Sequence, residues 1–156
     1  MLKKINVYDL DGTIICSLHR YKTLPCGTKI DLAYWRKNST PEKIARDSLL
    51  PLAKKYRQDI DNPEIYVVIA TARVLKKPDL DFIAKHLGIP DKIFGRLKGQ
   101  NTSGALLKVK WLSMFRQLKQ FRDLPITFFE DNLDYLGKVC DNLSAVGVYT
   151  PSKQGY

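Results

Sequence analysis

Two segments of the sequence place carboxylates directly after runs of apolar residues that are typical of buried strands. Asp9 and Asp11 follow the first of these runs, and Asp131 follows another one near the end of the chain. The carboxyl ends of parallel strands lie at one edge of a sheet, so the three carboxylates would meet there. Carboxylates crowded into a small volume repel one another unless a hard cation such as Mg²⁺ lies among them. We therefore expect a magnesium site.

A hydroxyl and a cation, Thr71 and Arg73, follow a third apolar run. A metal held by carboxylates, beside a threonine hydroxyl, an arginine and a lysine, is a suitable receptor for a phosphate dianion. One carboxylate could then attack phosphorus while another transfers protons, and water would hydrolyse the resulting aspartyl-phosphate. The residue types at the strand ends thus predict phosphoryl-transfer chemistry.

The elements that must position these groups alternate between strand and helix along the chain. Apolar runs with β-branched residues predict the strands, and helical spacing of apolar residues predicts the helices. The pattern predicts an α/β, Rossmann-like fold: a mostly parallel sheet with helices on both faces, in a single domain over 1–156. The strands are expected at 3–8, 64–70, 91–94, 125–129 and 145–149, and the helices at 40–56, 78–87, 105–121 and before Cys140. The segment 14–39 is expected to contain loops or a small hairpin.

Composition narrows the class of protein. The chain has 156 residues, of which 44% are hydrophobic and 27% charged, which excludes a disordered chain. Its apolar runs are far shorter than the roughly twenty residues of a membrane span, and the N-terminus lacks the pattern of a signal peptide. We therefore expect a cytoplasmic protein. The formal net charge of +10 favours polyanionic partners, above all nucleic acid, although a basic surface can also serve solubility alone.

Four motifs resemble those of the haloacid dehalogenase superfamily of phosphotransferases, in the family's order and over nearly the whole chain. They are Asp9-Leu10-Asp11-Gly12-Thr13, the run Val67–Arg73, a downstream lysine, and Phe128-Phe129-Glu130-Asp131. The resemblance implies the doubly wound fold of that superfamily, an aspartyl-phosphate intermediate and Mg²⁺ as the cofactor.

The same resemblance assigns roles to the acidic residues. Asp9 would be the nucleophile and Asp11 the general acid and base. Mg²⁺ would be held by Asp9, by the backbone carbonyl of Asp11 and by Asp131, with Glu130 as a secondary metal-site residue. Asp134 could take the place of Glu130, or could simply be a favourable charge at the start of a helix.

Thr71 and the motif lysine would bind the phosphoryl group. Three lysines are candidates for that role, Lys98, Lys108 and Lys110. A closer similarity, to the 3′-phosphatase domain of the phage polynucleotide kinases, favours Lys108. In that family an Arg-x-x-Gly turn precedes the motif lysine, and Arg96–Gly99 stands at the same separation from Lys108 here.

The similarity to the phage enzymes also has a limit. Arg20 and Arg73 match arginines of that family and would contact phosphate. Gly104, however, stands where the family has an acidic residue four positions before the lysine, so the orientation of the lysine and the identity of the substrate stay open. The sequence also lacks the Gly-x-x-x-x-Gly-Lys-Ser/Thr loop of a kinase.

Substrate choice would depend on the segment 14–39, which we expect to be a flap or minimal cap in a protein without a large cap. Its aromatic residues, Tyr34 and Trp35 among them, could stack nucleobases or could anchor the flap on the domain. The sequence predicts a Mg²⁺-dependent phosphomonoesterase that removes terminal 3′ phosphates from nucleic acid. The alternatives are a phosphatase of free nucleotides or other small phosphoesters, and a nucleic-acid-binding module without catalysis.

Overall fold

A single parallel sheet forms the centre of the computed structural model, which describes residues 1–152. Its five strands lie in the order β5-β4-β1-β6-β7, and every neighbouring pair is parallel. The strands are β1 (Lys4–Tyr8), β4 (Ile65–Val74), β5 (Lys92–Arg96), β6 (Ile126–Glu130) and β7 (Val146–Tyr149). The last four residues of the predicted domain lie outside the described residues.

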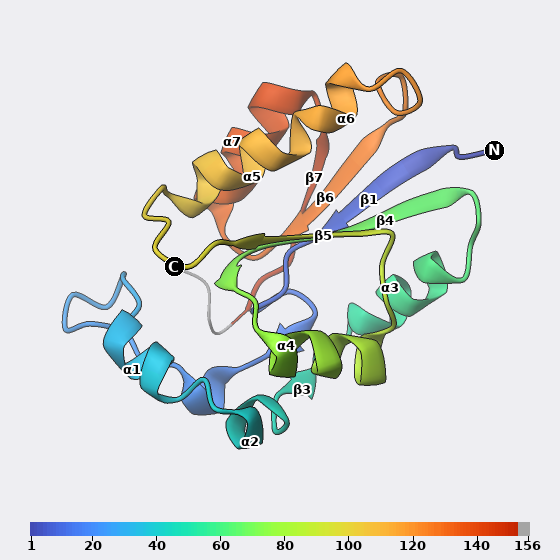
Figure 1. Ribbon diagram of the computed structural model, residues 1–156. Helices are drawn as coiled ribbons and strands as arrows, with labels where there is room; N and C mark the ends of the chain where they lie inside the picture. The colour runs from blue at the N-terminus through green and yellow to red at the C-terminus, as the bar shows by residue number, and fades with distance from the viewer. Residues whose placement is uncertain (153–156) are drawn as a thin grey trace.

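Helices cover both faces of this sheet (Figure 1). One face carries α3 (Ala53–Ile60) and α4 (Lys77–Phe82), which continues as a π-helical turn over Ile83–Leu87. The other face carries α5 (Gly104–Leu112), α6 (Met114–Gln117) and α7 (Leu133–Leu143). The predicted fold class, an α/β Rossmann-like parallel sheet with helices on both faces, is therefore confirmed.

The alternation of side chains along β1 explains why two separate cores form. Ile5 and Val7 point to the side of α5, α6 and α7, whereas Tyr8 packs with residues of α3 and α4. Asn6 also faces α3, where its amide donates to a carboxylate oxygen of Asp59 over 2.7 Å. Both faces of the central strand are thus buried.

An insert separates β1 from β4 and lies beyond the edge at which the strands end (Figure 1). We define the insert as residues 17–47. It connects the two strands of a short antiparallel hairpin. The hairpin and the insert contain β2 (Ile15–Cys16), a 3₁₀ turn (Leu18–Arg20), α1 (Leu32–Lys37), α2 (Pro41–Ile44) and β3 (Ser48–Leu49).

The predicted helix over 40–56 is wrong in its extent. Its start is correct, because the Thr40 hydroxyl accepts a hydrogen bond from the backbone N–H of Lys43 over 3.3 Å. The helix ends at Ile44, the chain then pairs with β2, and a new helix begins after Pro51. Pro51 cannot donate a backbone hydrogen bond, so it ends any helix that approaches it from the N-terminal side.

Other boundaries also differ from expectation, such as that of β5, which ends at Arg96 rather than at Phe94. The segment 14–39 contains α1 besides loops, because Asp31 caps that helix by accepting from the backbone N–H of Tyr34. Strand β4 extends four residues beyond the predicted end at Ala70, with an irregular register after Thr71. The single helix expected over 105–121 is divided at Ser113 into α5 and α6, and α6 ends at Gln117 because the next residue is extended. Among the described residues, no helix has the length and apolar character needed to cross a membrane.

Candidate active site

The strand ends bring together a buried ammonium group and three carboxylates, which we call the lysine cluster: Asp9, Lys108, Glu130 and Asp131. The Lys108 side chain reaches from α5 and donates to Oδ1 of Asp9 over 2.7 Å and to Oε2 of Glu130 over 2.6 Å. It is fully buried. Burial alone would favour the neutral amine, but the charges of Asp9 and Glu130 outweigh it and raise the pKa of Lys108.

The turn after β1 positions Asp9 within this cluster. The hydroxyl of Thr13 donates to Oδ2 of Asp9 over 3.1 Å. Gly12 has a φ of 77°, and a Cβ atom there would lie 2.2 Å from Oδ2 of Asp131 and 2.6 Å from Oγ of Ser152. Ser152 in turn donates to Oδ2 of Asp131 over 2.8 Å. A glycine is therefore required for the turn to lie against the Asp131 carboxylate.

The donor set of the lysine cluster fits a hard divalent cation. One carboxylate oxygen from each of Asp9, Glu130 and Asp131 lies within 4.8 Å of the others, and all three residues are buried. Burial and the nearby charge of Asp9 raise the pKa of Asp131 to about 7. Burial and the same charge also raise the pKa of Glu130, against the opposing charge of Lys108. A single ammonium does not balance three carboxylates, and oxygen ligands of this kind suit Mg²⁺.

Glu130 is the most constrained of the three acids. Its Oε1 accepts from the backbone N–H groups of Asp131 and Asn132, over 3.0 and 3.1 Å, while its Oε2 accepts from Lys108. This arrangement agrees with a secondary place at a metal site. Asp134 lies elsewhere, in the first turn of α7, with 63% of its side chain exposed and an ion pair to Lys138.

The side chain of Asp11 belongs to a second group of buried charges, which we call the arginine cluster: Asp11, Arg20, Asp47, Arg73 and Asp79. Arg73 donates through Nε to Oδ2 of Asp11 over 3.0 Å and through Nη2 to Oδ1 of the same carboxylate. Burial disfavours the charged carboxylate, but the Arg73 charge and hydrogen bonds outweigh it and hold the pKa of Asp11 below its usual value.

Arg20 forms a fork with Asp47, donating from Nε over 2.8 Å and from Nη2 over 2.7 Å. Its remaining nitrogen, Nη1, donates to the hydroxyl of Ser39 over 3.0 Å. Trp35 packs against both arginines: its ring centroid lies 4.2 Å from Cζ of Arg20 and 5.3 Å from Cζ of Arg73. The indole thus anchors the insert on the domain.

The two arginines expected to contact phosphate are therefore turned toward carboxylates. Arg20 has no exposed surface, and Arg73 is 8% exposed. Each nitrogen of both guanidinium groups has a protein partner. A phosphate contact by either arginine stays a prediction.

The remaining predicted residues lie as follows. Thr71 is buried on β4, two residues beyond Ile69, which pairs with Tyr8 on β1. Its hydroxyl accepts from the backbone N–H of Arg73 over 3.1 Å. Of the three candidate lysines, Lys108 is buried against Asp9, whereas Lys98 and Lys110 are exposed.

The structure also accounts for the glycine at position 104. A Cβ atom there would lie 2.5 Å from the hydroxyl oxygen of Tyr135. The ring of Tyr135 lies 5.1 Å from the ammonium nitrogen of Lys108. Glycine at position 104 therefore leaves room for the Tyr135 ring, whose face packs against Lys108.

Sequence reasoning did not single out Asp47 or Asp79, although both hold arginines of the site. Asp47 is 27 residues from Arg20, and no local pattern connects the two positions. Asp79 carried a weak signal, because an acid in the first turn of a helix accepts from the backbone there.

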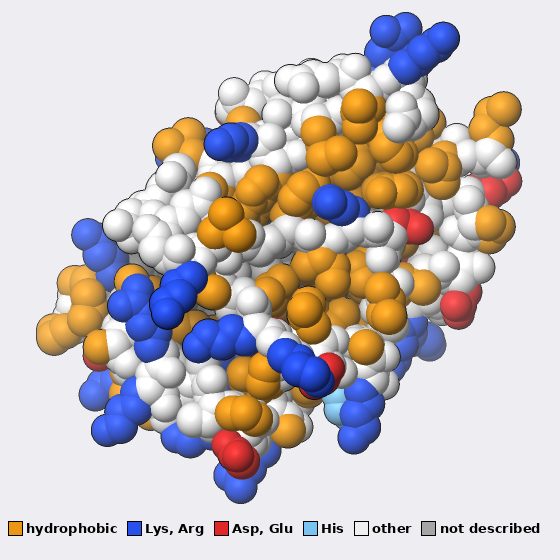
Figure 2. Space-filling view, viewed as in Figure 1, with side chains coloured by type: hydrophobic (Ala, Val, Ile, Leu, Met, Phe, Trp, Pro, Cys, Tyr) orange, Lys and Arg blue, Asp and Glu red, His pale blue; other side chains and the backbone are white. Residues whose placement is uncertain are grey.

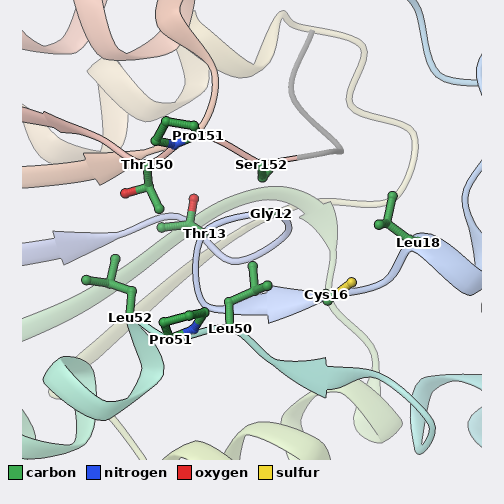
Figure 3. Close-up of a pocket in the computed structure, with 10 residues that line it drawn as sticks. All are labelled: Gly12, Thr13, Cys16, Leu18, Leu50, Pro51, Leu52, Thr150, Pro151 and Ser152. Atoms are coloured by element: carbon green, nitrogen blue, oxygen red, sulfur yellow. The ribbon is translucent and has the colours of Figure 1, made fainter.

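A pocket of about 630 Å³ adjoins the turn after β1 (Figure 3). Its walls come from that turn, from the segment before α3 and from the end of β7. Gly12 and Ser152 separate it from Asp131. Its lining is mainly apolar and consists of Gly12, Thr13, Cys16, Leu18, Leu50, Pro51, Leu52, Thr150, Pro151 and Ser152. The pocket therefore lies beside the candidate site, and the side chains of Asp9, Asp11 and Lys108 do not line it.

Comparison with known proteins identifies the family. The profile of the bacteriophage T5 5′-deoxynucleotidase family matches residues 1–94 of this chain. The chain belongs to this family. The 5′-deoxynucleotidase of Escherichia phage T5 is 33% identical over 88 residues, which make up 54% of this chain and 35% of that protein. The chain thus spans about a third of the length of this curated relative.

Solved structures of haloacid dehalogenase-type proteins have the same fold as this member of the 5′-deoxynucleotidase family. A chain of the Pnkp1/Rnl/Hen1 complex matches 97% of this chain and 47% of its own length, with a TM-score of 0.69 and 17% identity. A haloacid dehalogenase-like hydrolase from Streptococcus pneumoniae matches 97% of this chain and 88% of its own, with a TM-score of 0.64 and 13% identity. A predicted phosphoglycolate phosphatase from Haemophilus somnus gives a TM-score of 0.66 at 11% identity, covering 99% and 88%. The expected haloacid dehalogenase fold is confirmed.

Proposed function

We propose that this protein is a metal-dependent phosphomonoesterase that hydrolyses nucleotide phosphates through an aspartyl-phosphate intermediate. One observation carries the proposal. Asp9 is held by Lys108 inside a buried group of three carboxylates, while Asp11, two residues later, is held apart from it by Arg73. A nucleophile and a proton-transfer group are thereby supplied with different environments, as covalent phosphoryl transfer requires.

Each group of the proposed site would have one task in the reaction. The carboxylate of Asp9 would attack phosphorus in line, and the leaving oxygen would take a proton from Asp11. Lys108 and the Thr71 hydroxyl would bind the phosphoryl oxygens. Asp9, the backbone carbonyl of Asp11 and Asp131 would hold Mg²⁺, with Glu130 as a secondary ligand. The cation would neutralise charge on the phosphoryl group when bound.

The preferred substrate in this proposal is a deoxynucleoside 5′-monophosphate. Membership of the 5′-deoxynucleotidase family supports it, because the curated relative carries that activity in its name. The match covers the turn with Asp9 and Asp11, the insert and β4, which together form one side of the site. Most charged side chains of the site are buried, and a free nucleotide is small enough to reach them.

A terminal 3′ phosphate on nucleic acid is the second candidate substrate, and surface charge favours it. The insert exposes four cations around α1, which contribute to the group of Lys and Arg side chains at the lower left of Figure 2. They are Lys22, Lys29, Arg36 and Lys37. Such a surface, together with the net charge of +10, would attract a polyanionic strand.

A phosphatase panel separates these candidates. It compares kcat/KM for deoxynucleoside 5′-monophosphates, for oligonucleotides with a 3′ or a 5′ phosphate and for sugar phosphates, each over a series of salt concentrations. A preference for mononucleotides with little dependence on salt supports the first candidate. A preference for the 3′-phosphorylated oligonucleotide that falls steeply with salt supports the second. Absence of hydrolysis with every substrate and divalent cation tested, with retained oligonucleotide binding, would instead support a non-catalytic module.

A further inference from the structure

The arginine cluster contains a carboxylate, Asp79, that is connected to the site through Arg73. Asp79 lies in the first turn of α4 and accepts from Nη1 of Arg73 over 2.7 Å. Its other oxygen accepts from the backbone N–H of Lys76 over 2.9 Å. The carboxylate is therefore fixed from two directions, and only 4% of its side chain is exposed.

Arg73 transmits this fixed position to Asp11. Its guanidinium is planar and rigid, so a bond that fixes Nη1 also fixes the direction of Nε and Nη2. These two nitrogens form the fork on Asp11. Exposure is highest at one end of the series, since 4% of the Asp79 and Arg73 side chains and 24% of the Asp11 side chain are exposed. Asp11 is thus the end of the series that faces solvent.

The Asp11 carboxylate has few other restraints that would fix its orientation. Ser17 donates to its Oδ1 over 2.8 Å, but Ser17 belongs to the insert rather than to the sheet. Asp47, also from the insert, lies 3.8 Å from Nη2 of Arg73 and binds Arg20 more closely. The contact that links Asp11 to a helix packed on the sheet is the one through Arg73 to Asp79.

We infer that Asp79 is a positioning residue: by fixing Arg73 it orients the Asp11 carboxylate for proton transfer to the leaving group. This inference rests on the proposed function, in which Asp11 is the general acid. Asp79 touches neither the substrate nor the reacting atoms. Its contribution therefore depends on how much the leaving group needs a proton.

That dependence gives the test. An alkoxide, such as the 5′ oxygen of a nucleoside, leaves with a proton, whereas nitrophenolate leaves without one. We expect Asp79→Asn, which keeps the shape of the side chain, to lower kcat/KM for a deoxynucleoside 5′-monophosphate by about 10²-fold. The value for p-nitrophenyl phosphate should change by less than about threefold, because general acid catalysis contributes little there.

The kinetic constant is chosen to isolate one half of the reaction. The value of kcat/KM reports the steps up to release of the leaving group, so later hydrolysis of the aspartyl-phosphate does not enter it. Asp81→Asn is the matched control, because Asp81 lies on the same helix with 61% of its side chain exposed and forms an ion pair with Lys77. It should leave both substrates unchanged.

A second measurement needs no substrate and no metal. In the ¹H–¹⁵N spectrum, the Nε–H signal of Arg73 should be sharp and slow to exchange in the wild type and in Asp81→Asn. It should broaden or exchange rapidly in Asp79→Asn, because the guanidinium loses one of its two anchors. Should Asp79→Asn fail to fold, Arg73→Lys tests the same connection, since lysine keeps the charge but cannot form the fork.

The outcomes are decisive in either direction. A selective loss with the nucleotide in a folded variant supports the inference. Equal losses with both substrates in a folded variant, or an unchanged Arg73 signal with unchanged kinetics, overturn it. Full activity of Asp9→Asn would instead remove the proposed function, and the Arg73 signal would still show whether Asp79 positions that side chain.

Discussion

The lysine cluster and the arginine cluster lie side by side at the same sheet edge, yet the pKa values of their carboxyl groups are shifted in opposite directions. In the lysine cluster one ammonium faces three carboxylates, and the pKa values of Asp131 and Glu130 are raised by burial and by the charge of Asp9. In the arginine cluster two guanidinium groups face three carboxylates, and the pKa of Asp11 is lowered, because the Arg73 charge outweighs burial.

The geometry of the two cations explains this difference. A guanidinium has five N–H donors in a rigid plane, so it can form forks on carboxylates and bind several of them at once. An ammonium is a compact charge with three donors, and Lys108 donates to Asp9 and Glu130 rather than to Asp131. The arginine cluster thus carries one negative charge in excess and binds all its carboxylates, whereas the lysine cluster carries two in excess, which a proton or a metal ion can neutralise.

The largest expected effect comes from removing the nucleophile. Asp9→Asn should lower kcat for every substrate by on the order of 10⁴-fold or more, because a covalent pathway loses its attacking group. Steady-state assays with Asp123→Asn as the control, a site with 90% of its side chain exposed, would measure this. A variant with a tenth or more of wild-type turnover would place the nucleophile at another residue.

The next largest effect comes from removing a carboxylate of the arginine cluster. Asp47→Asn leaves the fully buried Arg20 without its paired charge, and we expect the free energy of unfolding to fall by about 3–5 kcal/mol. Urea denaturation of this variant and of the exposed Asp81→Asn measures the difference, with the control expected within about 0.5 kcal/mol of the wild type. A loss at position 47 as small as that of the control would show that the fork is not needed for stability.

The matching change in the lysine cluster should have the opposite sign. Asp131→Asn removes one of the crowded carboxylates, so at pH 8 and without metal we expect the free energy of unfolding to rise by about 1–3 kcal/mol. Added Mg²⁺ should raise the Tm of the wild type and have little effect on the variant. Thermal unfolding with EDTA and with Mg²⁺ tests both statements. A metal-free variant less stable than the wild type would contradict the account of stored repulsion.

The smallest effect is the dependence on pH. The pKa of Asp131 in the folded protein is about 7, above its ordinary value of 3.8. The folded state therefore binds more protons than the unfolded state between these values, and stability is lost as pH rises toward and through 7. In metal-free protein we expect the free energy of unfolding to fall by about 1 kcal/mol between pH 6 and pH 8. Asp131→Asn should flatten this slope, and a wild-type stability that rises over the interval would refute the prediction.

The sequence predicted the scaffold of the site well, because its signals are local. Continuous apolar runs indicated buried strands, and acids directly after β1 and β6 had to lie at the carboxyl edge of a parallel sheet. The similarity to the phage polynucleotide kinases, through the spacing from the Arg96–Gly99 turn, then favoured Lys108 over two exposed lysines, and the structure places it beside Asp9. These features depend on spacing within short segments.

The rest could not be predicted, because it depends on contacts between distant segments. The partner of Arg20 is Asp47, and which carboxylate would neutralise that arginine is decided by how the insert folds back. The helix expected over 40–56 failed for a similar reason. Its spacing of apolar residues was correct, but pairing of β3 with β2 drew the middle of the segment into a hairpin.

Trapping the covalent intermediate tests the central proposal most directly. Borohydride reduces an acyl phosphate to an alcohol, so adding it during turnover of a deoxynucleoside 5′-monophosphate with Mg²⁺ should convert Asp9 to homoserine. Peptide mass spectrometry should show this change in the wild type, and not when substrate is omitted or in Asp9→Asn. Continued turnover with an unmodified Asp9 peptide, or modification of a different carboxylate, would contradict the assignment of Asp9 as the group that accepts the phosphoryl moiety.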